Sequence, residues 1–294
     1  MASIAKTIVA TGGSSGVGFE ALKQLLAQAQ TQPYKLILGV RDPQRTKAAY
    51  DELKYDTTKH DLTFLPLELS NLQNVKTFAQ QTLQALGETK IDYLFLNAGM
   101  FKRAQGPGPH GSKWSETYVV NHLSQHYLIH LLREKLEASR SRIVVVSSGA
   151  VQAIKDPSIL EGIIKADSTA GFELYQASKF IQLLGAQWWK RQLRGTCQVV
   201  AVSPGLIPQT GLGRYGDVKL DMSMTDAKTV PEGGASLLRA FTRDDFPEDP
   251  QRIFLTSWGE WWPTSVYAPA LDEQLQDKWS PSKDEIEKEE GITA

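Results

Sequence analysis

Short runs of apolar, β-branched residues alternate with longer amphipathic stretches along most of this chain. Most of the runs are apolar throughout, as in strands that are covered on both faces. The alternation predicts an α/β chain with one doubly wound sheet of about seven parallel strands and helices on both faces. The expected strands are Thr7–Ala10, Lys35–Val40, Leu62–Leu67, Ile91–Leu96, Arg142–Ser147, Cys197–Ser203 and Arg252–Thr256. The expected helices are Gly16–Gln30, Asn71–Leu86, Lys113–Ala138, Phe172–Leu193 and Pro231–Phe241.

The length of 294 residues suits one such domain, because α/β sheets often run to about 250 residues as a single unit. We expect this domain over residues 1–256 and a C-terminal extension over residues 257–294, which carries four of the seven tryptophans. Two further segments, 150–171 and 205–229, interrupt the alternation. The second is rich in glycine and is longer than an ordinary loop, which is typical of a functional lid or of a disordered segment.

The charge balance and the cysteine count exclude several classes of function. Lys and Arg number 32 against 33 Asp and Glu, so no overall field draws the chain to nucleic acid or anionic lipid. The single cysteine, Cys197, excludes an internal disulfide and a multi-cysteine metal site and fits a reducing compartment. No apolar run approaches the roughly 18 residues of a membrane span. Since residues 1–6 also lack the pattern of a signal peptide, we predict a cytoplasmic protein.

A glycine-rich loop, Thr11–Gly18, follows the first expected strand and leads into the first expected helix. Glycines at 12, 16 and 18 allow a sharp turn and the close approach of a pyrophosphate to backbone N–H groups. The N-terminus of the helix adds the positive end of its dipole. No Gly-Lys-Ser/Thr follows, which excludes a P-loop. The loop is therefore interpreted as a dinucleotide site.

The second expected strand ends at Val40 and is followed by Arg41 and Asp42. In this architecture the tip of that strand faces the adenosine ribose, where a carboxylate favours a free 2′-hydroxyl and an arginine accommodates a 2′-phosphate. Arg41 comes first after the apolar run, so we predict NADP(H) rather than NAD(H). In the alternative interpretation Arg41 is an ordinary loop residue and Asp42 caps the following helix.

Tyr175 and Lys179 lie four residues apart, on one face of an expected helix. A phenol has an ordinary pKa near 10, and a neighbouring ammonium lowers that pKa by favouring the phenolate. Tyr175 is then suited to exchange a proton with a carbonyl or alcohol oxygen while hydride moves at the adjacent carbon.

Together these motifs resemble the short-chain dehydrogenase/reductase family, over roughly residues 5–240. The sequence near Asn121 and Arg41 is most similar to the branch of retinol dehydrogenases and protochlorophyllide reductases. The matching segments are Thr11–Gly18, Asn97–Gly99, Val120–His122, Val146–Ser148, Tyr175–Lys179 and Ser203–Gly205.

The resemblance implies a Rossmann fold with NAD(P) bound across the sheet and a catalytic tetrad of Asn121, Ser148, Tyr175 and Lys179. Ser148 would hold the substrate oxygen, Tyr175 would act as acid and base, and Lys179 would hold the nicotinamide ribose. Asn121 would order the water through which protons reach Lys179. The implied cofactor contacts are Gly12, Ser14, Ser15, Gly16, Val17, Gly18, Arg41, Glu68, Leu69, Asn97, Ala98, Gly99, Tyr175, Lys179, Pro204, Gly205, Ile207 and Thr210.

Three positions depart from the pattern of the family. Glu68 stands where an aspartate is usual on the turn after the third strand. Gln209 stands where the family has its threonine, so Thr210 is taken for the nicotinamide contact. The neighbouring Ser147 is a second candidate for the working hydroxyl, although Ser148 matches the second serine of the family.

Three histidines and the C-terminal tryptophans have simpler interpretations. His122, His126 and His130 recur every four residues, which suits packing better than a metal site, and we predict no metal. The tryptophans after residue 257 either cover a hydrophobic substrate pocket or pack on the edge of the sheet.

From these features we expect an NADP-dependent reductase of ketones or aldehydes that acts on a hydrophobic small molecule. A homo-oligomer is possible, and a nucleic-acid partner is not expected. The alternative is a non-catalytic NADP-binding sensor or scaffold on the same fold, against which the Ser148, Tyr175 and Lys179 set argues.

Overall fold

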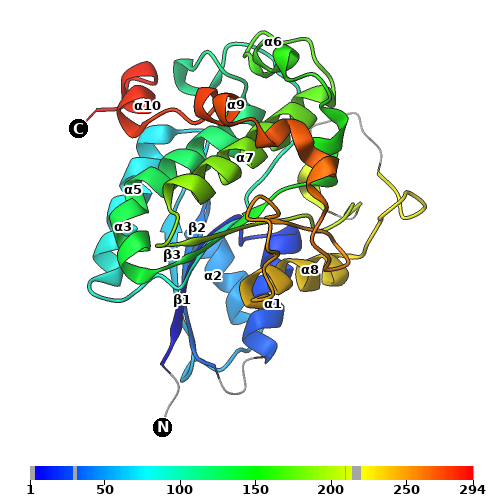
Figure 1. Ribbon diagram of the computed structural model, residues 1–294. Coiled ribbons are helices and arrows are strands. Elements are labelled where there is room, and N and C mark those ends of the chain that lie inside the picture. Colours follow the sequence, from blue (N-terminus) through cyan, green and yellow to red (C-terminus); the bar gives the residue numbers. More distant parts are fainter. Residues whose placement is uncertain (1–3, 29–31, 209, 214–219, 294) are drawn as a thin grey trace.

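The computed structural model describes residues 4–28, 32–208, 210–213 and 220–293 (Figure 1). Its strands form one sheet in the order β3-β2-β1-β4-β5-β6-β7, and every neighbouring pair is parallel. The predicted parallel sheet of seven strands is therefore confirmed. The strands are β1 (Lys6–Thr11), β2 (Tyr34–Val40), β3 (Asp61–Pro66), β4 (Tyr93–Leu96), β5 (Arg142–Val146), β6 (Gln198–Val202) and β7 (Phe254–Leu255).

Helices cover both faces of the sheet. On one face lie α1 (Gly16–Gln28), α2 (Pro43–Asp51) and α8 (Val230–Thr242), and on the other lie α3 (Leu72–Leu86), α5 (Ser124–Ser139) and α7 (Glu173–Gln192) (Figure 1). The shorter helices are α4 (Glu116–Tyr118), α6 (Leu160–Ile164), α9 (Glu273–Lys278) and α10 (Lys283–Glu289).

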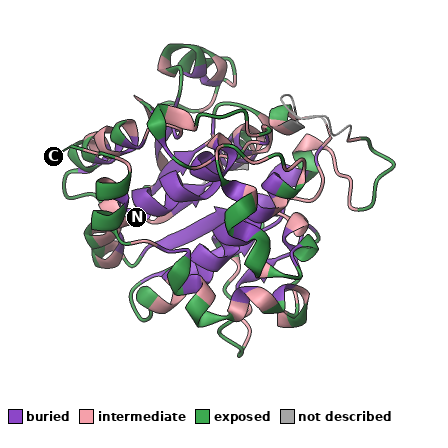
Figure 2. Cartoon of the chain, turned by 90° about the horizontal axis from the view of Figure 1, so that it is seen from above, coloured by how far each residue is buried: buried purple, intermediate pink, exposed green. Residues whose placement is uncertain are grey.

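Neighbouring residues of one strand enter different layers of the core. In β1, Ile8 packs in the cluster that holds Leu22 of α1, whereas Val9 packs in the cluster that holds Phe78 of α3. All four side chains are buried. Figure 2 shows the buried residues gathered along the sheet and on the helix faces turned toward it. Strands covered in this way are apolar at every position, which is the pattern seen in the sequence.

Several elements differ from the prediction, among them α2, which was not expected, and two whose starts have a clear local cause. The helix expected to start at Lys113 starts at Glu116, where the hydroxyl of Ser115 accepts a hydrogen bond from the backbone N–H of Tyr118. The last strand, β7, is only two residues long, because the chain turns just before it: the backbone N–H of Arg252 donates to the carbonyl of Asp249. Capping and turn contacts therefore decide where these elements begin.

The C-terminal segment after β7 returns over the layer of α5 and α7. Trp279 and Ile286 belong to the same core cluster as the buried faces of these two helices. The tryptophan packs against the rings of Trp114 and Tyr118, at centroid distances of 6.4 and 6.2 Å. The segment is thus part of the hydrophobic core on this side of the sheet.

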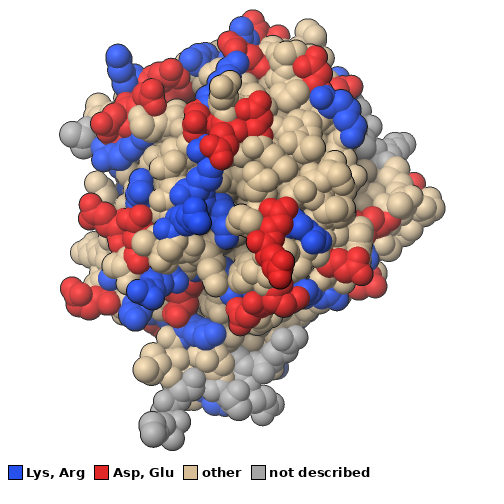
Figure 3. All heavy atoms as spheres, viewed as in Figure 1, with Lys and Arg blue, Asp and Glu red and all other residues tan. Residues whose placement is uncertain are grey.

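The surface carries charges of both signs. On the face shown in Figure 3, Lys and Arg side chains are interspersed with Asp and Glu side chains. This fits the net charge of −1, and this face presents no broad field of one sign. Among the described residues, no helix is long and apolar enough to cross a membrane.

Candidate active site

The crevice of the sheet lies between β1 and β4. β1 pairs with β2 on one side and with β4 on the other, so the strand order reverses here. In doubly wound sheets, ligands bind beyond the carboxyl ends of the strands at this point. The glycine loop follows β1 and Asn97 follows β4, so the fold brings both to the crevice.

Gly12 and Gly18 let the glycine loop lie directly on the segment that follows β4. Gly12 has a φ of +69°, and a Cβ atom there would lie 2.6 Å from the Cα of Ala98. A Cβ atom at Gly18 would lie 2.1 Å from Nδ2 of Asn97. This Nδ2 donates a hydrogen bond of 2.8 Å to the carbonyl of Gly12. Any side chain at these two glycines would push the loop off the sheet edge.

The loop and its surroundings fit a dinucleotide. α1 is 13 residues long, and Ser14 and Ser15 lie exposed just before its first turn, whose N–H groups have no partner within the helix. The Oδ1 atom of Asn97 is buried and accepts no hydrogen bond from the described residues. A hydroxyl or amide of a bound dinucleotide would supply the missing donor.

The tip of β2 presents Arg41 to solvent. The carboxylate of Asp42 caps α2 by accepting a hydrogen bond of 2.9 Å from the backbone N–H of Arg45. Arg41 is exposed and makes no hydrogen bond or ion pair with the described part of the chain. The carboxylate at this tip is therefore committed to a helix cap, while the guanidinium of Arg41 is free to meet a phosphate.

Glu68 and Leu69 form a tight turn after β3. The carboxylate of Glu68 accepts hydrogen bonds from the backbone N–H and the hydroxyl of Ser70, at 3.1 and 3.0 Å. The N–H of Glu68 donates to Oδ1 of Asn74 at 2.5 Å. Leu69 is buried. The glutamate that replaces the usual aspartate thus holds its own turn, and an adenine contact at this turn stays a prediction.

Tyr175 lies in the first turn of α7, buried among aromatic rings. Its ring stacks on that of Phe172 at a centroid distance of 5.3 Å, and the ring of Phe101 meets it edge-on at 6.2 Å. Burial raises the pKa of Tyr175 to about 12, and the hydrogen bond with the side chain of Ser148 lowers it by a smaller amount. At neutral pH the phenol is therefore protonated and joined to Ser148.

The two serines at the end of β5 are in different situations. The hydroxyl of Ser148 accepts a hydrogen bond of 3.2 Å from the N–H of Ala150, at the start of the 3₁₀ helix η3 (Gly149–Ala153). The hydroxyl of Ser147 is buried and has no partner among the described residues. Of the two candidates, Ser148 is the one that reaches Tyr175.

Lys179 is buried one turn after Tyr175 on α7. Its ammonium donates to the carbonyl of Val146 at 2.9 Å and to Oε1 of Gln182 at 3.2 Å. Burial lowers the pKa of Lys179 to about 7. Burial is the main cause that shifts the pKa of Tyr175. That Lys179 lowers the pKa of the tyrosine stays a prediction.

Asn121 lies in a π-helical turn, η2 (Val119–Leu123), between α4 and α5. Its side chain accepts from the N–H of Met100 at 2.8 Å and donates to the carbonyl of Met100 at 2.9 Å. Its own backbone carbonyl accepts a hydrogen bond of 2.9 Å from Nε2 of Gln182. Asn121 is thus linked to Lys179 through Gln182, by a backbone carbonyl that lies in the π-helical turn.

Gln182 is a site residue that the sequence reasoning missed. It follows Tyr175 by seven positions and Lys179 by three, so it continues the same face of α7. That spacing was visible in the sequence. Ser178 was missed as well: its hydroxyl accepts a hydrogen bond of 2.9 Å from Nδ2 of Asn121. Helical spacing alone does not distinguish such residues from ordinary core positions.

The segment after β6 crosses the crevice toward β4. Ile207 lies against α8, where a Cβ atom on Gly233 would come within 2.7 Å of its Cδ1. Thr210 lies against the glycine loop, since a Cβ atom on Gly16 would be 3.7 Å from its Cγ2. The N–H of Phe101 then donates to the carbonyl of Leu212 at 3.3 Å.

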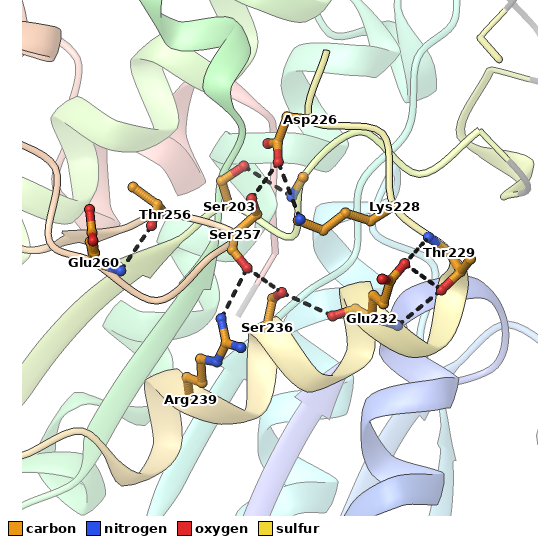
Figure 4. Close-up of polar contacts among 11 residues, drawn as sticks. Ser203, Asp226, Lys228, Thr229, Glu232, Ser236, Arg239, Thr256, Ser257 and Glu260 are labelled. Carbon is orange, nitrogen blue, oxygen red and sulfur yellow. Dashed lines mark hydrogen bonds and ion pairs between the residues drawn. The ribbon is translucent and has the colours of Figure 1, made fainter. Parts of the chain in front are cut away.

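The base of this segment is fastened to the loop after β7 (Figure 4). The hydroxyl of Ser257 donates to Oδ1 of Asp226 at 2.5 Å, and the carbonyl of Ser257 accepts from Ser236 at 2.7 Å and from Arg239 at 3.1 Å. Pro204 and Gly205 lie at this base. Gln209 and residues 214–219, which belong to the predicted lid, lie outside the described residues.

Three histidines, His122 of η2 and His126 and His130 of α5, hold the C-terminal segment. Nε2 of His122 is 3.0 Å from the carbonyl of Trp279, and Nε2 of His126 is 2.9 Å from that of Pro281. His130 reaches the same proline carbonyl at 3.1 Å. Burial lowers the pKa of His122 and of His130 to about 4, and it holds the pKa of His126 well below its usual range.

Comparison with known proteins extends this description. The profile of the family described as short chain dehydrogenase matches residues 6–160. A short-chain dehydrogenase/reductase of Pestalotiopsis microspora is 59% identical over 290 residues, which are 97% of this chain and 99% of that protein. Retinol dehydrogenase 13 of Homo sapiens is 30% identical over 213 residues, 71% of this chain and 61% of the human protein.

Solved structures share the fold at lower identity. The NADPH-bound carbonyl reductase from chicken fatty liver superposes with a TM-score of 0.63 at 19% identity, covering 88% of this chain and 98% of that one. A short-chain dehydrogenase from Sphingobium yanoikuyae in complex with NADPH gives a TM-score of 0.64 at 20% identity, with 94% and 95% covered.

Proposed function

The chain belongs to the short-chain dehydrogenase/reductase family of oxidoreductases, and from this we propose that it is an NADP-dependent reductase of ketones or aldehydes. Its substrate is a hydrophobic small molecule with a carbonyl group, or the corresponding alcohol in the reverse direction. The observation that carries the proposal is the buried, protonated phenol of Tyr175 joined to Ser148, with Lys179 one turn away.

Each of these residues has a distinct task in the proposed reaction. NADPH, when bound, supplies the hydride that is transferred to the carbonyl carbon. The phenol of Tyr175 is protonated at neutral pH, so it is able to donate a proton to the substrate oxygen. Ser148 donates a hydrogen bond to that oxygen and polarises the carbonyl. Gln182 accepts a hydrogen bond from Lys179 and donates one to the carbonyl of Asn121, and these contacts keep the two residues in place next to the tyrosine.

The preference for NADP is proposed from Arg41. Its guanidinium is exposed and unengaged by the described residues, whereas the carboxylate of Asp42 is used as a helix cap. The variant Arg41→Ala is expected to weaken NADPH binding by about ten- to a hundredfold, the worth of one charge-assisted contact, and to leave NADH binding nearly unchanged. Titration of both cofactors by fluorescence measures this. Equal losses for the two cofactors would mean that Arg41 does not meet the 2′-phosphate.

The proposed reaction is tested by NADPH oxidation with a panel of ketones, aldehydes and quinones. Tyr175→Phe keeps the aromatic packing and removes the proton donor, so turnover should fall about 100-fold or more while NADPH affinity stays the same. The neighbouring serines provide a matched pair: Ser148→Ala should lose activity and Ser147→Ala should keep it. Turnover in Tyr175→Phe equal to that of the wild type would refute the assignment.

The non-catalytic alternative gives a different result in the same assay. A sensor or scaffold on this fold would bind NADPH and show no oxidation with any carbonyl compound in the panel. It would also be indifferent to Tyr175→Phe and Ser148→Ala, because such a protein needs no proton donor. The buried hydrogen bond between these two side chains favours the enzyme.

A further inference from the structure

The C-terminal segment places Trp262 against Gly149, the residue after the proposed catalytic serine. A Cβ atom on Gly149, the residue after Ser148, would lie 3.3 Å from Cη2 at the far edge of the indole ring. The space that a side chain would occupy at this position is therefore taken by Trp262. The tryptophan comes from a part of the chain more than one hundred residues away, so the contact is made by the fold.

The backbone of Trp262 is held firmly in this position. Its N–H donates to the carbonyl of Phe254 in β7 at 2.8 Å, and Nε of Arg252 donates to its carbonyl at 3.2 Å. Its ring meets that of Phe254 edge-on, with centroids 4.6 Å apart and planes at 87°. An indole fixed by two backbone hydrogen bonds and by packing on Phe254 is ready to receive a ligand without first being ordered.

The adjacent Trp261 points to the other side of the sheet. It packs in the second core cluster and against the ring of Phe246 at 5.4 Å, and it is buried. Trp262 belongs to the cluster of α5 and α7 and is only partly buried. The two consecutive tryptophans thus have separate roles. Trp261 fills the core, whereas one edge of the Trp262 ring lies against Gly149.

The other member of the catalytic pair is also bordered by rings. Phe172 lies nearly parallel to the ring of Tyr175, with an interplanar angle of 23°, and Phe101 closes the corner edge-on to Phe172 at 5.4 Å. Phe172 is partly exposed and Phe101 is buried. The reacting position therefore has aromatic rings next to the tyrosine and an indole next to the serine.

The aromatic surface continues outward from Trp262. Trp258 meets it edge-on at a centroid distance of 6.2 Å and is 51% exposed. Its indole N–H is engaged with Glu260 at 3.0 Å, so the ring presents its apolar atoms. Trp258 therefore extends the apolar edge of Trp262 outward to solvent.

We propose that Trp262 is a specificity-determining residue that selects flat, ring-bearing carbonyl compounds over small aliphatic ones. An aromatic ring attached to the carbonyl group would lie between Phe172, which stacks on Tyr175, and Trp262, which lies against Gly149, and it would stack on the indole or meet it edge-on. Such ring contacts favour aromatic partners beyond their buried area. The inference rests on the proposed reductase function, because it assigns the substrate class of the same site.

The test compares two ketones of different shape, 2-acetylnaphthalene and butanone, as substrates with NADPH. Trp262→Leu keeps an apolar side chain and removes the ring. We expect it to lower kcat/KM for 2-acetylnaphthalene about tenfold or more, mainly through KM, and to leave kcat/KM for butanone within about twofold. Trp262→Phe retains a ring and should restore part of the difference. Trp261→Phe, altered on the opposite face, is the control and should not change the ratio of the two ketones.

A binding measurement separates this inference from the proposed function. Calorimetry follows 2-acetylnaphthalene binding to NADP⁺-loaded Tyr175→Phe protein, with and without Trp262→Leu, so that turnover is not needed. Weaker binding caused by Trp262→Leu supports the role of Trp262 in binding the ring even if no carbonyl compound is reduced, and in that case only the reductase assignment fails. Reduction of both ketones with a ratio that Trp262→Leu leaves unchanged, together with unchanged binding, overturns the inference and leaves the reductase standing.

Discussion

The buried ammonium of Lys179 should make the protein less stable at neutral pH than at alkaline pH. Lys179 is 3% exposed, and burial lowers its pKa from 10.5 to about 7. In the unfolded chain the same amine keeps its ordinary pKa. Between these two values the unfolded state binds one more proton than the folded state, so the free energy of unfolding rises with pH.

The magnitude follows from the size of the shift. One pKa unit corresponds to about 1.4 kcal/mol, so the shift costs about 5 kcal/mol of stability when the amine is charged in both states. Because the folded-state group is half neutral at pH 7, the gain between pH 7 and pH 9 is about 2 kcal/mol. Above the pKa of the unfolded state the amine no longer destabilises the fold, and below pH 7 the cost approaches the full value of about 5 kcal/mol.

The variant Lys179→Met removes the titrating group and keeps the length of the side chain. It leaves the carbonyl of Val146 and Oε1 of Gln182 without their donor, which costs about 1 kcal/mol for each, at every pH. The two effects are therefore separable, since the lost hydrogen bonds change the level of the stability curve and the lost amine changes its slope.

Urea unfolding of the wild type and of Lys179→Met, followed at several pH values from 7 to 9, measures the difference in slope. We expect the wild type to gain about 2 kcal/mol relative to the variant over this range, since other titrating groups contribute equally to both proteins. The variant should also lack NADPH oxidation. Parallel stability curves for the two proteins would refute the claim that the ammonium is destabilised by burial.

Two further predictions follow from the contacts around the site. Burial lowers the pKa values of His122 and His130 to about 4, so their neutral imidazoles stabilise the fold above pH 6.5, and this stability is lost as the pH falls toward 4. The melting temperature of the double variant His122→Gln/His130→Gln should therefore depend less steeply on pH between 6.5 and 4 than that of the wild type. An equally steep dependence in the two proteins would refute the argument. Thr210 packs against Gly16, and the carbonyl of Leu212 accepts a hydrogen bond from Phe101. Hydrogen exchange over residues 205–208, 210–213 and 220–229 should therefore slow when NADP⁺ and a ketone are both bound. Slow exchange that the ligands leave unchanged would mean that this segment is a fixed wall.

The sheet could be predicted from the sequence because its strands are buried on both faces. Each central strand reads as an unbroken apolar run, and few folds other than a covered parallel sheet produce such runs with glycines and amphipathic stretches between them. Where an end depends on a local contact, the prediction was less accurate. β7 is short because of a turn at Asp249 and Arg252, and such a turn leaves no apolar signal.

The candidate site was predictable as a set of motifs, and its electrostatics were not. Spacing places Tyr175 and Lys179 on one face of α7, but it does not show which way an ammonium points. In the structure it points to Val146 and Gln182, so burial is the main influence on the pKa of both groups. The sequence also left the tryptophans undecided between core and pocket, because the choice depends on the register of a short segment in which Trp261 and Trp262 face opposite sides.

Burial favours the neutral form of both Tyr175 and Lys179. Burial keeps the phenol of Tyr175 protonated and brings Lys179 to the point where, near pH 7, half of the amines are neutral. The free site therefore carries no negative charge and at most one positive charge. A protonated phenol is what the reduction of a carbonyl requires, whereas oxidation of an alcohol requires the phenolate, whose formation at neutral pH is opposed by about five pKa units. For the proposed reductase, the protonation state of these two side chains suits the reduction of a carbonyl, and oxidation of an alcohol would need positive charge brought close to Tyr175 by the bound cofactor.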